Sequence, residues 1–273
     1  MKRFISILSI LCMLFAATEF FSVAKAQSTS DSTEKHYLTL QYQKVLPGKR
    51  TAYLEMLKSY WRAGHEAQIQ KGLIVSWKLY EVSYPNGDSQ DYDFIQVTEY
   101  PKWASMEEPY KGINQESLIG ESKAKERSEV SDNARKNIKI ETLDVNFYTS
   151  TFSSAKNNLL EVYYLKVLPG KYGEFVKINT SLMQPMNEAI AQASGGSYSW
   201  ASMWLRTPAM IDYPYNYVAF NGFESLTQME SSTLSNVRKE WSEKSSQGYP
   251  ILSSSRSRYR NELWRLVDSV TTK

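Results

Sequence analysis

A five-residue segment, Val-Leu-Pro-Gly-Lys, occurs twice in this chain of 273 residues, at positions 45–49 and again at 167–171. A tyrosine and a lysine precede both copies at matching positions, with a constant spacing of 122 between the copies. Further along, the spacing becomes 123 and pairs Trp77 with Trp200. This period is far longer than the roughly 20–50 residues of solenoid repeats. It therefore indicates a duplicated domain rather than an array of short repeats.

The first 26 residues have the features of a secretory signal peptide. Basic residues at positions 2 and 3 are followed by a mostly apolar stretch, 4–15, and then by Ala-Lys-Ala at 24–26. A membrane anchor is the alternative, but the apolar stretch is shorter than the roughly 20 residues that span a bilayer, and Glu19 follows it. We expect cleavage after Ala26 and export, as for a bacterial protein, to the periplasm or the extracellular space. Residues 27–35 predict a flexible leader.

Cys12 is the one cysteine of the chain and lies within this segment, so the mature chain has no thiol. Disulfides, cysteine nucleophiles and thiolate metal sites are therefore excluded from it. Removing residues 1–26 takes away three cations and one carboxylate, which lowers the formal net charge from +3 to +1. Nucleic-acid binding requires a basic surface, which this balance does not predict. No polybasic run predicts membrane attachment after cleavage.

Hydrophobic periodicity predicts the same order of elements in each half of the mature chain: strand, helix, strand, strand, helix, strand. In the first repeat, residues 36–148, these are 37–45, 48–70, 73–82, 92–100, 101–136 and 137–145. In the second repeat, residues 159–273, they are 159–167, 170–193, 197–206, 215–223, 224–243 and 258–268. Pro85-Asn86-Gly87-Asp88 predicts a tight turn in the first hairpin. Residues 149–158, rich in Ser, Thr and Asn, predict a linker.

This order is ferredoxin-like, a βαββαβ arrangement in which two helices cover one face of an antiparallel sheet. Lys-Val-Leu-Pro-Gly-Lys ends the first strand of each half, and the helix that follows carries an aromatic residue, Tyr53 or Phe175. In these features the chain resembles the dimeric α+β barrel superfamily, which includes antibiotic-biosynthesis-monooxygenase-like and NIPSNAP-like proteins. The resemblance implies an α+β fold in which two ferredoxin-like repeats of one chain form an intrachain pseudo-dimeric barrel. We therefore expect a monomer.

His36 and His65 are the two histidines, and histidine is the commonest acid-base and metal-binding side chain. His36 precedes the first strand and is typical of a solvated terminal residue. His65 lies on the same helical face as Leu57 and Trp61, so it could point into a cavity between helix and sheet. The other interpretation is a hydrogen-bonded, partly buried side chain. Its counterpart in the second repeat is Asn187.

Metal ions and cofactors have little support in the sequence, and we expect neither. The two histidines are 29 positions apart, and no carboxylate pair lies at ligand spacing around either of them. Haem-binding members of the superfamily that this chain resembles use an axial histidine, and only His65 could serve in that role. The chain also lacks the Gly-x-Ser-x-Gly elbow of serine hydrolases and the loop of a phosphate-binding Walker motif.

Phe, Trp and Tyr make up 36 of the 273 residues and concentrate on the predicted strands and first helices. They fit either core packing or the lining of a pocket for an apolar or aromatic ligand. The candidate ligand-binding residues are Trp61, Trp77, Tyr92, Trp200, Trp204 and Arg206.

Two functional hypotheses follow, and the sequence leaves open whether the protein is an enzyme. The first is an exported, non-catalytic barrel protein that binds a small apolar or aromatic ligand, or a protein partner. The alternative, suggested by the resemblance, is a cofactor-independent monooxygenase-like or isomerase-like enzyme. In it, His65 is the catalytic base or ligand, and Trp61, Trp77 and Tyr92 shape the pocket. A cavity of roughly a few hundred Å³ beside a buried His65 would favour the enzyme.

Overall fold

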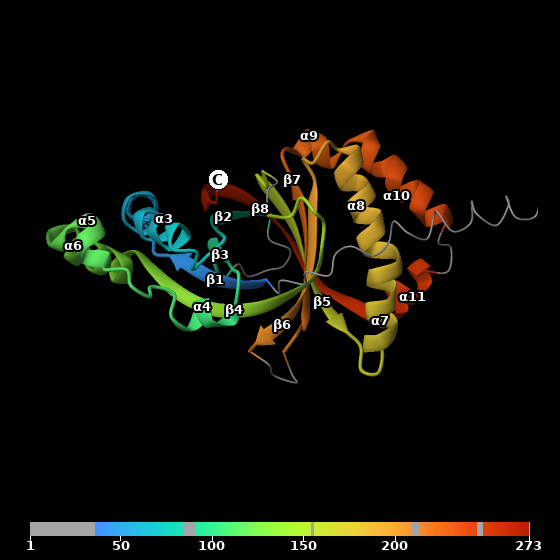
Figure 1. Ribbon diagram of the computed structural model, residues 1–273, viewed down its shortest axis with the longest axis horizontal. Coiled ribbons are helices and arrows are strands. Elements are labelled where there is room, and N and C mark those ends of the chain that lie inside the picture. Colours follow the sequence, from blue (N-terminus) through green and yellow to red (C-terminus); the bar gives the residue numbers. More distant parts are fainter. Residues whose placement is uncertain (1–35, 85–90, 154–155, 209–212, 245–247, 273) are drawn as a thin grey trace, which may run out of the picture. The chain divides into compact units, whose positions relative to one another are not determined.

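The computed structural model describes residues 36–84, 91–153, 156–208, 213–244 and 248–272. Eight antiparallel strands form a closed barrel in the order β1-β3-β2-β8-β5-β7-β6-β4 (Figure 1). The strands are β1 (Tyr37–Val45), β2 (Ser76–Tyr84), β3 (Phe94–Tyr100), β4 (Arg135–Tyr148), β5 (Leu159–Val167), β6 (Ser199–Thr207), β7 (Tyr217–Phe223) and β8 (Arg256–Thr271). The predicted α+β fold class is confirmed. The predicted signal peptide, the leader and the turn at 85–88 lie outside the described residues.

Each half of the chain contributes four neighbouring strands to the barrel. β4, β1, β3 and β2 precede residue 149, whereas β8, β5, β7 and β6 follow residue 158. Pairing of β2 with β8 and of β4 with β6 joins the two sets. The register also recurs: Tyr37 pairs with Tyr100, and Leu159 pairs with Phe223, which are the residues 122 and 123 positions later. Corresponding residues therefore build the same local sheet in both halves.

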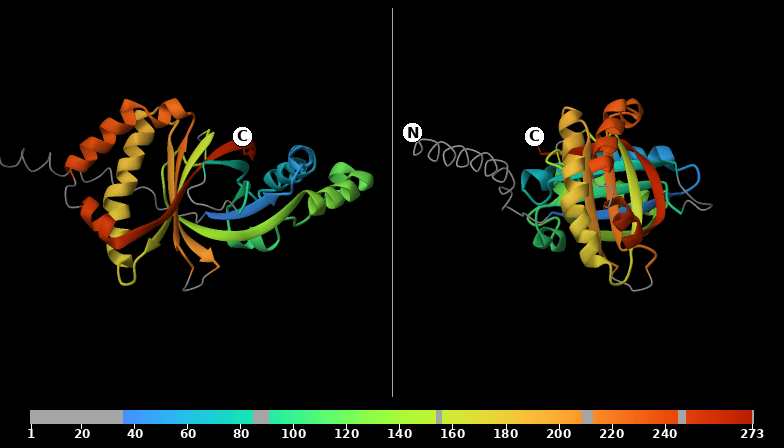
Figure 2. Two further views of the ribbon diagram at one scale, coloured as in Figure 1. Left: turned by 180° about the vertical axis from the view of Figure 1, so that it is seen from behind. Right: turned by 90° about the vertical axis from the view of Figure 1, so that its right-hand side faces the viewer.

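Helices cover the outer face of the sheet, as Figures 1 and 2 show. The first half contains α2 (Arg50–Met56), a π-helical turn (Leu57–Trp61), α3 (Arg62–Gln70), α4 (Trp103–Glu107), α5 (Gln115–Ile119) and α6 (Glu121–Ala134). The second half contains α7 (Tyr172–Ile178), a π-helical turn (Asn179–Met183), α8 (Gln184–Ala193), α9 (Leu226–Met229), α10 (Ser232–Lys244) and α11 (Gly248–Ser255). None of the helices within the described ranges is long and apolar enough to span a bilayer.

Three helical regions differ from the sequence prediction. The region 101–136 forms three helices instead of one, because Gly112 and Gly120 adopt positive φ angles and interrupt it. The predicted helix 224–243 is broken between α9 and α10. Helix α11 was not expected, since Pro250 and three serines are typical of a loop. Leu252 of α11 is buried in the second-half core, and this packing outweighs the weak helix propensity.

Buried side chains occupy both faces of the sheet. One cluster fills the barrel interior and includes Leu40 of the first half and Val162 of the second. Other clusters lie between the sheet and the helices, around Trp77 in the first half and around Trp200 and Tyr217 in the second. Sites for chemistry or binding can therefore lie either inside the barrel or under the helices.

Candidate functional site

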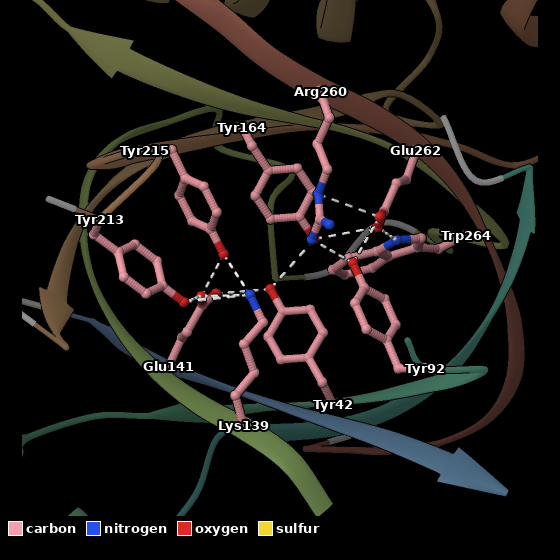
Figure 3. A network of polar contacts seen from close by, with 10 residues as sticks. All are labelled: Tyr42, Tyr92, Lys139, Glu141, Tyr164, Tyr213, Tyr215, Arg260, Glu262 and Trp264. Carbon is pink, nitrogen blue, oxygen red and sulfur yellow. Dashed lines mark hydrogen bonds and ion pairs between the residues drawn. The ribbon is translucent and has the colours of Figure 1, made fainter. Parts of the chain in front are cut away.

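Ten side chains inside the barrel form a continuous polar network, drawn in Figure 3. Two buried carboxylates, Glu141 of β4 and Glu262 of β8, are its centres. We refer to the ten residues as the barrel network: Tyr42, Tyr92, Lys139, Glu141, Tyr164, Tyr213, Tyr215, Arg260, Glu262 and Trp264.

Glu141 receives hydrogen bonds from four donors. The Tyr42 hydroxyl donates to Oε2 at 2.7 Å. Lys139 Nζ and the Tyr213 hydroxyl donate to Oε1 at 2.7 and 2.5 Å, and the Tyr215 hydroxyl donates to the same oxygen. The carboxylate is therefore saturated and held next to a cation.

Glu262 is surrounded in the same way. The Tyr92 hydroxyl donates to Oε1 at 2.6 Å, and Arg260 Nε lies 3.4 Å from that oxygen. The Tyr164 hydroxyl and Trp264 Nε1 donate to Oε2 at 3.2 and 2.8 Å. Both carboxylates thus have an adjacent cation two positions earlier on the same strand.

The network connects the two halves of the chain in a crossed arrangement. Tyr215 of the second half donates to Glu141 of the first half, and Tyr92 of the first half donates to Glu262 of the second. Neither carboxylate would be fully hydrogen-bonded by its own half alone. The network therefore stabilises the closed barrel.

Tyr42 and Tyr164 meet at the centre of the network, where their hydroxyl oxygens are 3.2 Å apart. Burial, and then the charges of neighbouring groups, raise the pKa of both phenols, so they stay protonated and donate. Lys139 Nζ lies 4.2 Å from the ring centroid of Tyr42, and the Arg260 guanidinium lies 4.3 Å from that of Tyr164. Burial lowers the pKa of Lys139, and Glu141 opposes that shift.

The barrel network leaves no room for a ligand on its carboxylates. A carboxylate offers about four lone-pair positions. Four hydrogen-bond donors surround Glu141, and three donors and the Arg260 guanidinium surround Glu262. In the described part of the chain, no group of three or more metal-ligating side chains could hold a metal ion. We therefore regard the network as structural. Its charged centres, Lys139-x-Glu141 and Arg260-x-Glu262, recur at a spacing of 121 but are not among the predicted site residues.

His65 is buried between α3 and the sheet. Its ring stacks on Trp77 with centroids 4.5 Å apart, and its Nδ1 lies 2.7 Å from Gln68 Oε1. Burial lowers the pKa of His65 to about 4, with Gln68 opposing the shift, so the ring is neutral at pH 7. The neighbouring hollow, lined by Trp61 and Gly64, measures only about 10 Å³. Within the described residues, no ligand-sized cavity of the kind that would favour a catalytic His65 lies beside its ring.

The predicted enzyme pocket does not assemble around His65. Trp61 and Trp77 do lie next to its ring, with centroids at 6.3 and 4.5 Å. Tyr92 instead points into the barrel and belongs to the barrel network. β3 is buried on both faces, one toward the barrel interior and one toward the helices. Aromatic content in the sequence does not show which of these two faces a residue belongs to.

A histidine-ligated haem does not fit the described residues. His65 is packed against Trp77, with no haem-sized space at its ring. His36 contacts Glu99 Oε1 at 2.9 Å through its Nδ1. Neither histidine lines the large cavity described below.

The other predicted ligand-binding residues are dispersed. Trp204 packs against Tyr217, with ring centroids 4.7 Å apart. Arg206 is exposed and forms an ion pair with Asp144 at 3.4 Å. Trp200 lines the large cavity, and it is the one member of the predicted set that does so.

A cavity of about 520 Å³ lies between the outer face of the second-half sheet and helices α8, α10 and α11. Its wall combines aromatic and sulfur-containing side chains with amides and hydroxyls. Apart from arginines, the lining residues are Trp200, Tyr163, Tyr217, Tyr249, Leu165, Ala219, Met183, Met186, Asn179, Asn187, Asn221, Ser202 and Ser253. Three arginines, Arg238, Arg256 and Arg258, complete the lining. Ser253 and Arg258 are exposed, so the cavity reaches solvent at that side.

Smaller side chains explain why the cavity lies in the second half. Repeat spacing places Asn179, Met183, Ser202 and Ala219 where the first half has Leu57, Trp61, Leu79 and Gln96. Leu57 and Leu79 are fully buried and fill the first-half core. In the second half, the hydroxyl of Tyr217 donates to Ser202 Oγ at 2.6 Å, a contact that its counterpart Phe94 cannot make.

Hydrogen bonds hold the polar lining in place. Tyr198 donates to Asn187 Oδ1 at 2.6 Å, and Asn187 Nδ2 donates to the backbone oxygen of Met183 at 2.7 Å. Asn221 Nδ2 donates to Glu161 Oε2 at 3.0 Å. The amide of Asn187 therefore has a fixed orientation at the cavity wall, which suits specific recognition of a small molecule.

No known family model matches this chain, and no curated protein matches its sequence. Solved structures do share its fold. A proposed monooxygenase from Fusobacterium nucleatum is 14% identical, with 87% of this chain and 95% of that chain covered and a TM-score of 0.53. A proposed chlorite dismutase is 13% identical, with 86% and 95% covered and a TM-score of 0.50. These similarities establish an α+β barrel fold.

Proposed function

We propose that this protein binds a small, partly aromatic organic molecule in the second-half cavity and is not itself an enzyme. The cavity volume of about 520 Å³ carries the proposal. It falls within the range of about 300–1,000 Å³ that small-molecule sites occupy. Trp200 and Tyr217 offer flat apolar surface, whereas Asn187 offers a fixed polar group.

Binding is favoured over catalysis by the chemistry of the wall. Among the described residues that line the cavity, none is His, Asp or Glu. Burial raises the pKa of Tyr217, so its phenol is a poor base near neutral pH. The proposed monooxygenase among the structural neighbours keeps the enzyme alternative in view, but His65 lies away from this cavity.

We further propose that the barrel arose by duplication and acts as a monomer, with each half in the place of one subunit of a dimeric barrel. The repeated register of β1–β3 and β5–β7 supports this. The signal-like residues 1–26 support export to the periplasm or beyond. The charge balance of the mature chain argues against nucleic acid or membranes as partners.

Native mass spectrometry of residues 27–273, purified from an exporting host, tests the proposed function. We expect an additional small-molecule mass that disappears on denaturation. The double variant Ser202→Leu/Tyr217→Phe places the first-half pair, Leu79 and Phe94, in the cavity and should abolish that mass. The control is Ser59→Leu, the same change at an exposed helix position.

Two outcomes would contradict the proposed function. One is retention of the additional mass by Ser202→Leu/Tyr217→Phe, which would mean that the ligand binds elsewhere. The other is a clean apo mass for the wild-type protein together with no binding of aromatic probes at millimolar concentration. The charge-state distribution of the same spectra reports whether the chain is a monomer.

A further inference from the structure

Arg256 is a half-buried cation at the wall of the second-half cavity. Within the described ranges, no carboxylate pairs with Arg256, Arg238 or Arg258. Two half-buried cations of the barrel interior do pair with carboxylates: Lys139 contacts Glu141 at 2.7 Å, and Arg260 lies 3.4 Å from Glu262. An exposed arginine needs no such partner, because water solvates it. A half-buried one loses part of that solvation.

The strand geometry brings a second cation next to Arg256. Arg256 and Arg258 pair with Val167 and Leu165 of β5, two positions apart, so both side chains lie on the outer face of the sheet. Burial lowers the pKa of Arg256, and repulsion by Arg258 adds to that effect while Tyr217 opposes it. Both arginines line the cavity. Among the described residues that line the cavity, the charged ones are all arginines.

Arg238 adds a third positive charge from α10, where it is exposed at the cavity. The carboxylate of Glu161 is already engaged, because Tyr163 donates to one of its oxygens and Asn221 donates to the other at 3.0 Å. Glu161 itself does not line the cavity, although the two residues that donate to it do. Arg258 itself lies over the ring of Tyr163, 4.9 Å from its centroid.

The rest of the wall suits an aromatic body. Trp200 and Tyr217 present ring surface, and Met183 and Met186 present polarizable sulfur, which contacts aromatic rings favourably. The Tyr249 hydroxyl contacts Met186 Sδ at 3.1 Å and fixes that side chain. The apolar wall and the arginines together make this an amphipathic site with one charged end.

We propose that the ligand of this cavity is an aromatic carboxylic acid whose carboxylate is bound by Arg256, with Arg258 and Arg238 drawing it to the entrance. The planar guanidinium of arginine matches a carboxylate with two parallel hydrogen bonds. The ring system of the ligand lies against Trp200 and the methionines. This inference rests on the proposed function, because it names the chemistry of the ligand in the same cavity.

Two probes with the same ring system test the inference: 2-naphthoic acid and its uncharged amide, 2-naphthamide. Affinities are measured by isothermal titration calorimetry on residues 27–273 at pH 7. We expect the acid to bind at least about tenfold more tightly than the amide. Arg256→Met keeps an apolar stem of similar length. It should lower the affinity for the acid by about tenfold or more and leave the affinity for the amide unchanged. The control is Arg206→Met, an exposed arginine away from the cavity.

Arg258→Gln provides a second variant if Arg256→Met fails to fold, since Arg258 is exposed. Arg258→Gln should lower the affinity for the acid severalfold, and added salt should reduce this difference from the wild-type protein. Equal affinity of the acid and the amide, with no loss in either arginine variant, would overturn the carboxylate inference and leave the proposed function intact. Absence of binding by both probes, or binding that survives Ser202→Leu/Tyr217→Phe, would overturn the proposed function as well.

Discussion

Glu141 is fully buried and is the most heavily hydrogen-bonded carboxylate of the barrel network, which makes Glu141→Gln a sharp test of its role. The substitution keeps the size of the side chain but removes its charge. The Lys139 ammonium, about a quarter exposed, then faces a neutral amide. Three donors converge on Oε1, so the amide oxygen takes that position and the amide NH₂ faces Tyr42.

The expected cost is about 3 kcal/mol. Removing one partner of a buried ion pair costs about 3–5 kcal/mol, and the partial exposure of Lys139 favours the lower end. For a chain of this size, 1 kcal/mol shifts the melting temperature by about 2–4 °C, so the variant should melt about 6–12 °C lower. Urea unfolding followed by tryptophan fluorescence measures the free energy, and calorimetry measures the melting temperature.

Two further variants separate charge from packing. Glu174→Gln makes the same substitution in a solvent-accessible ion pair, in which Glu174 Oε1 lies 2.8 Å from Lys171 Nζ. It should lower the free energy of unfolding by less than about 1 kcal/mol. Lys139→Met added to Glu141→Gln removes the unpaired cation and should restore part of the lost stability. A loss below about 1 kcal/mol for Glu141→Gln, or no recovery in the double variant, would refute a stabilising role for the network.

The remaining predictions concern pH and packing. Because burial lowers the pKa of His65 to about 4 from 6.5, the unfolded chain binds this proton at higher pH than the folded chain does. Stability should therefore be complete above pH 6.5 and fall by up to about 3 kcal/mol as the pH drops to 4, and His65→Asn should flatten that part of the urea-midpoint profile; an unchanged slope would contradict the depressed pKa. Gly222→Ala should destabilise the fold by about 1–3 kcal/mol, because its Cβ would overlap Asn157 Oδ1 and Ser199 Oγ. Gly173→Ala, in open space within α7, should instead stabilise the fold by up to about 1 kcal/mol. Changes in melting temperature of the same sign for the two variants would contradict this description of the packing.

The order of elements along each half of the chain was accessible from the sequence because two signals agreed. Hydrophobic periodicity predicted the strands, and the repeat predicted that each half would have the same order of elements. Helix boundaries were less accessible where tertiary packing decides them. Leu252 stabilises α11 through contacts with residues far away in the sequence, and no local pattern encodes such contacts.

The barrel network was missed for a related reason. Residues 137–145 alternate polar and apolar side chains, a pattern that is typical of a strand with one polar and one apolar face. Closure of the barrel turns Lys139 and Glu141 inward, where Tyr215 and Tyr213 satisfy the carboxylate. Whether a polar strand face meets water or another polar face depends on the partner strands, and those are distant in sequence.

His65 illustrates the limit on predicting a site. The sequence allowed either a hydrogen-bonded, buried histidine or one that faces a cavity, and helical periodicity could not separate the two. The structure places it in the core with Gln68 and Trp77. The cavity itself was encoded in the repeat: smaller residues at Ser202 and Asn179 replace leucines of the first half. Only the three-dimensional structure shows that these smaller residues line the same cavity.

Together with the proposed duplication, the difference between the halves suggests how such a barrel can acquire a binding site. Residues facing the barrel interior are constrained by both halves at once, since Tyr92 and Tyr215 each complete the other half's carboxylate. Residues under the helices pack mainly within their own half, although Val267 and Val270 of β8 reach the first-half cluster and Phe147 of β4 reaches a second-half one. A change there, such as leucine to serine at 202, empties space at a local cost of a few kcal/mol and leaves the barrel closed. The first half, filled by Leu57, Leu79 and Trp77, keeps its share of the core. Under this reasoning, binding evolves on the outer face of one half because the other half and the shared interior preserve the fold.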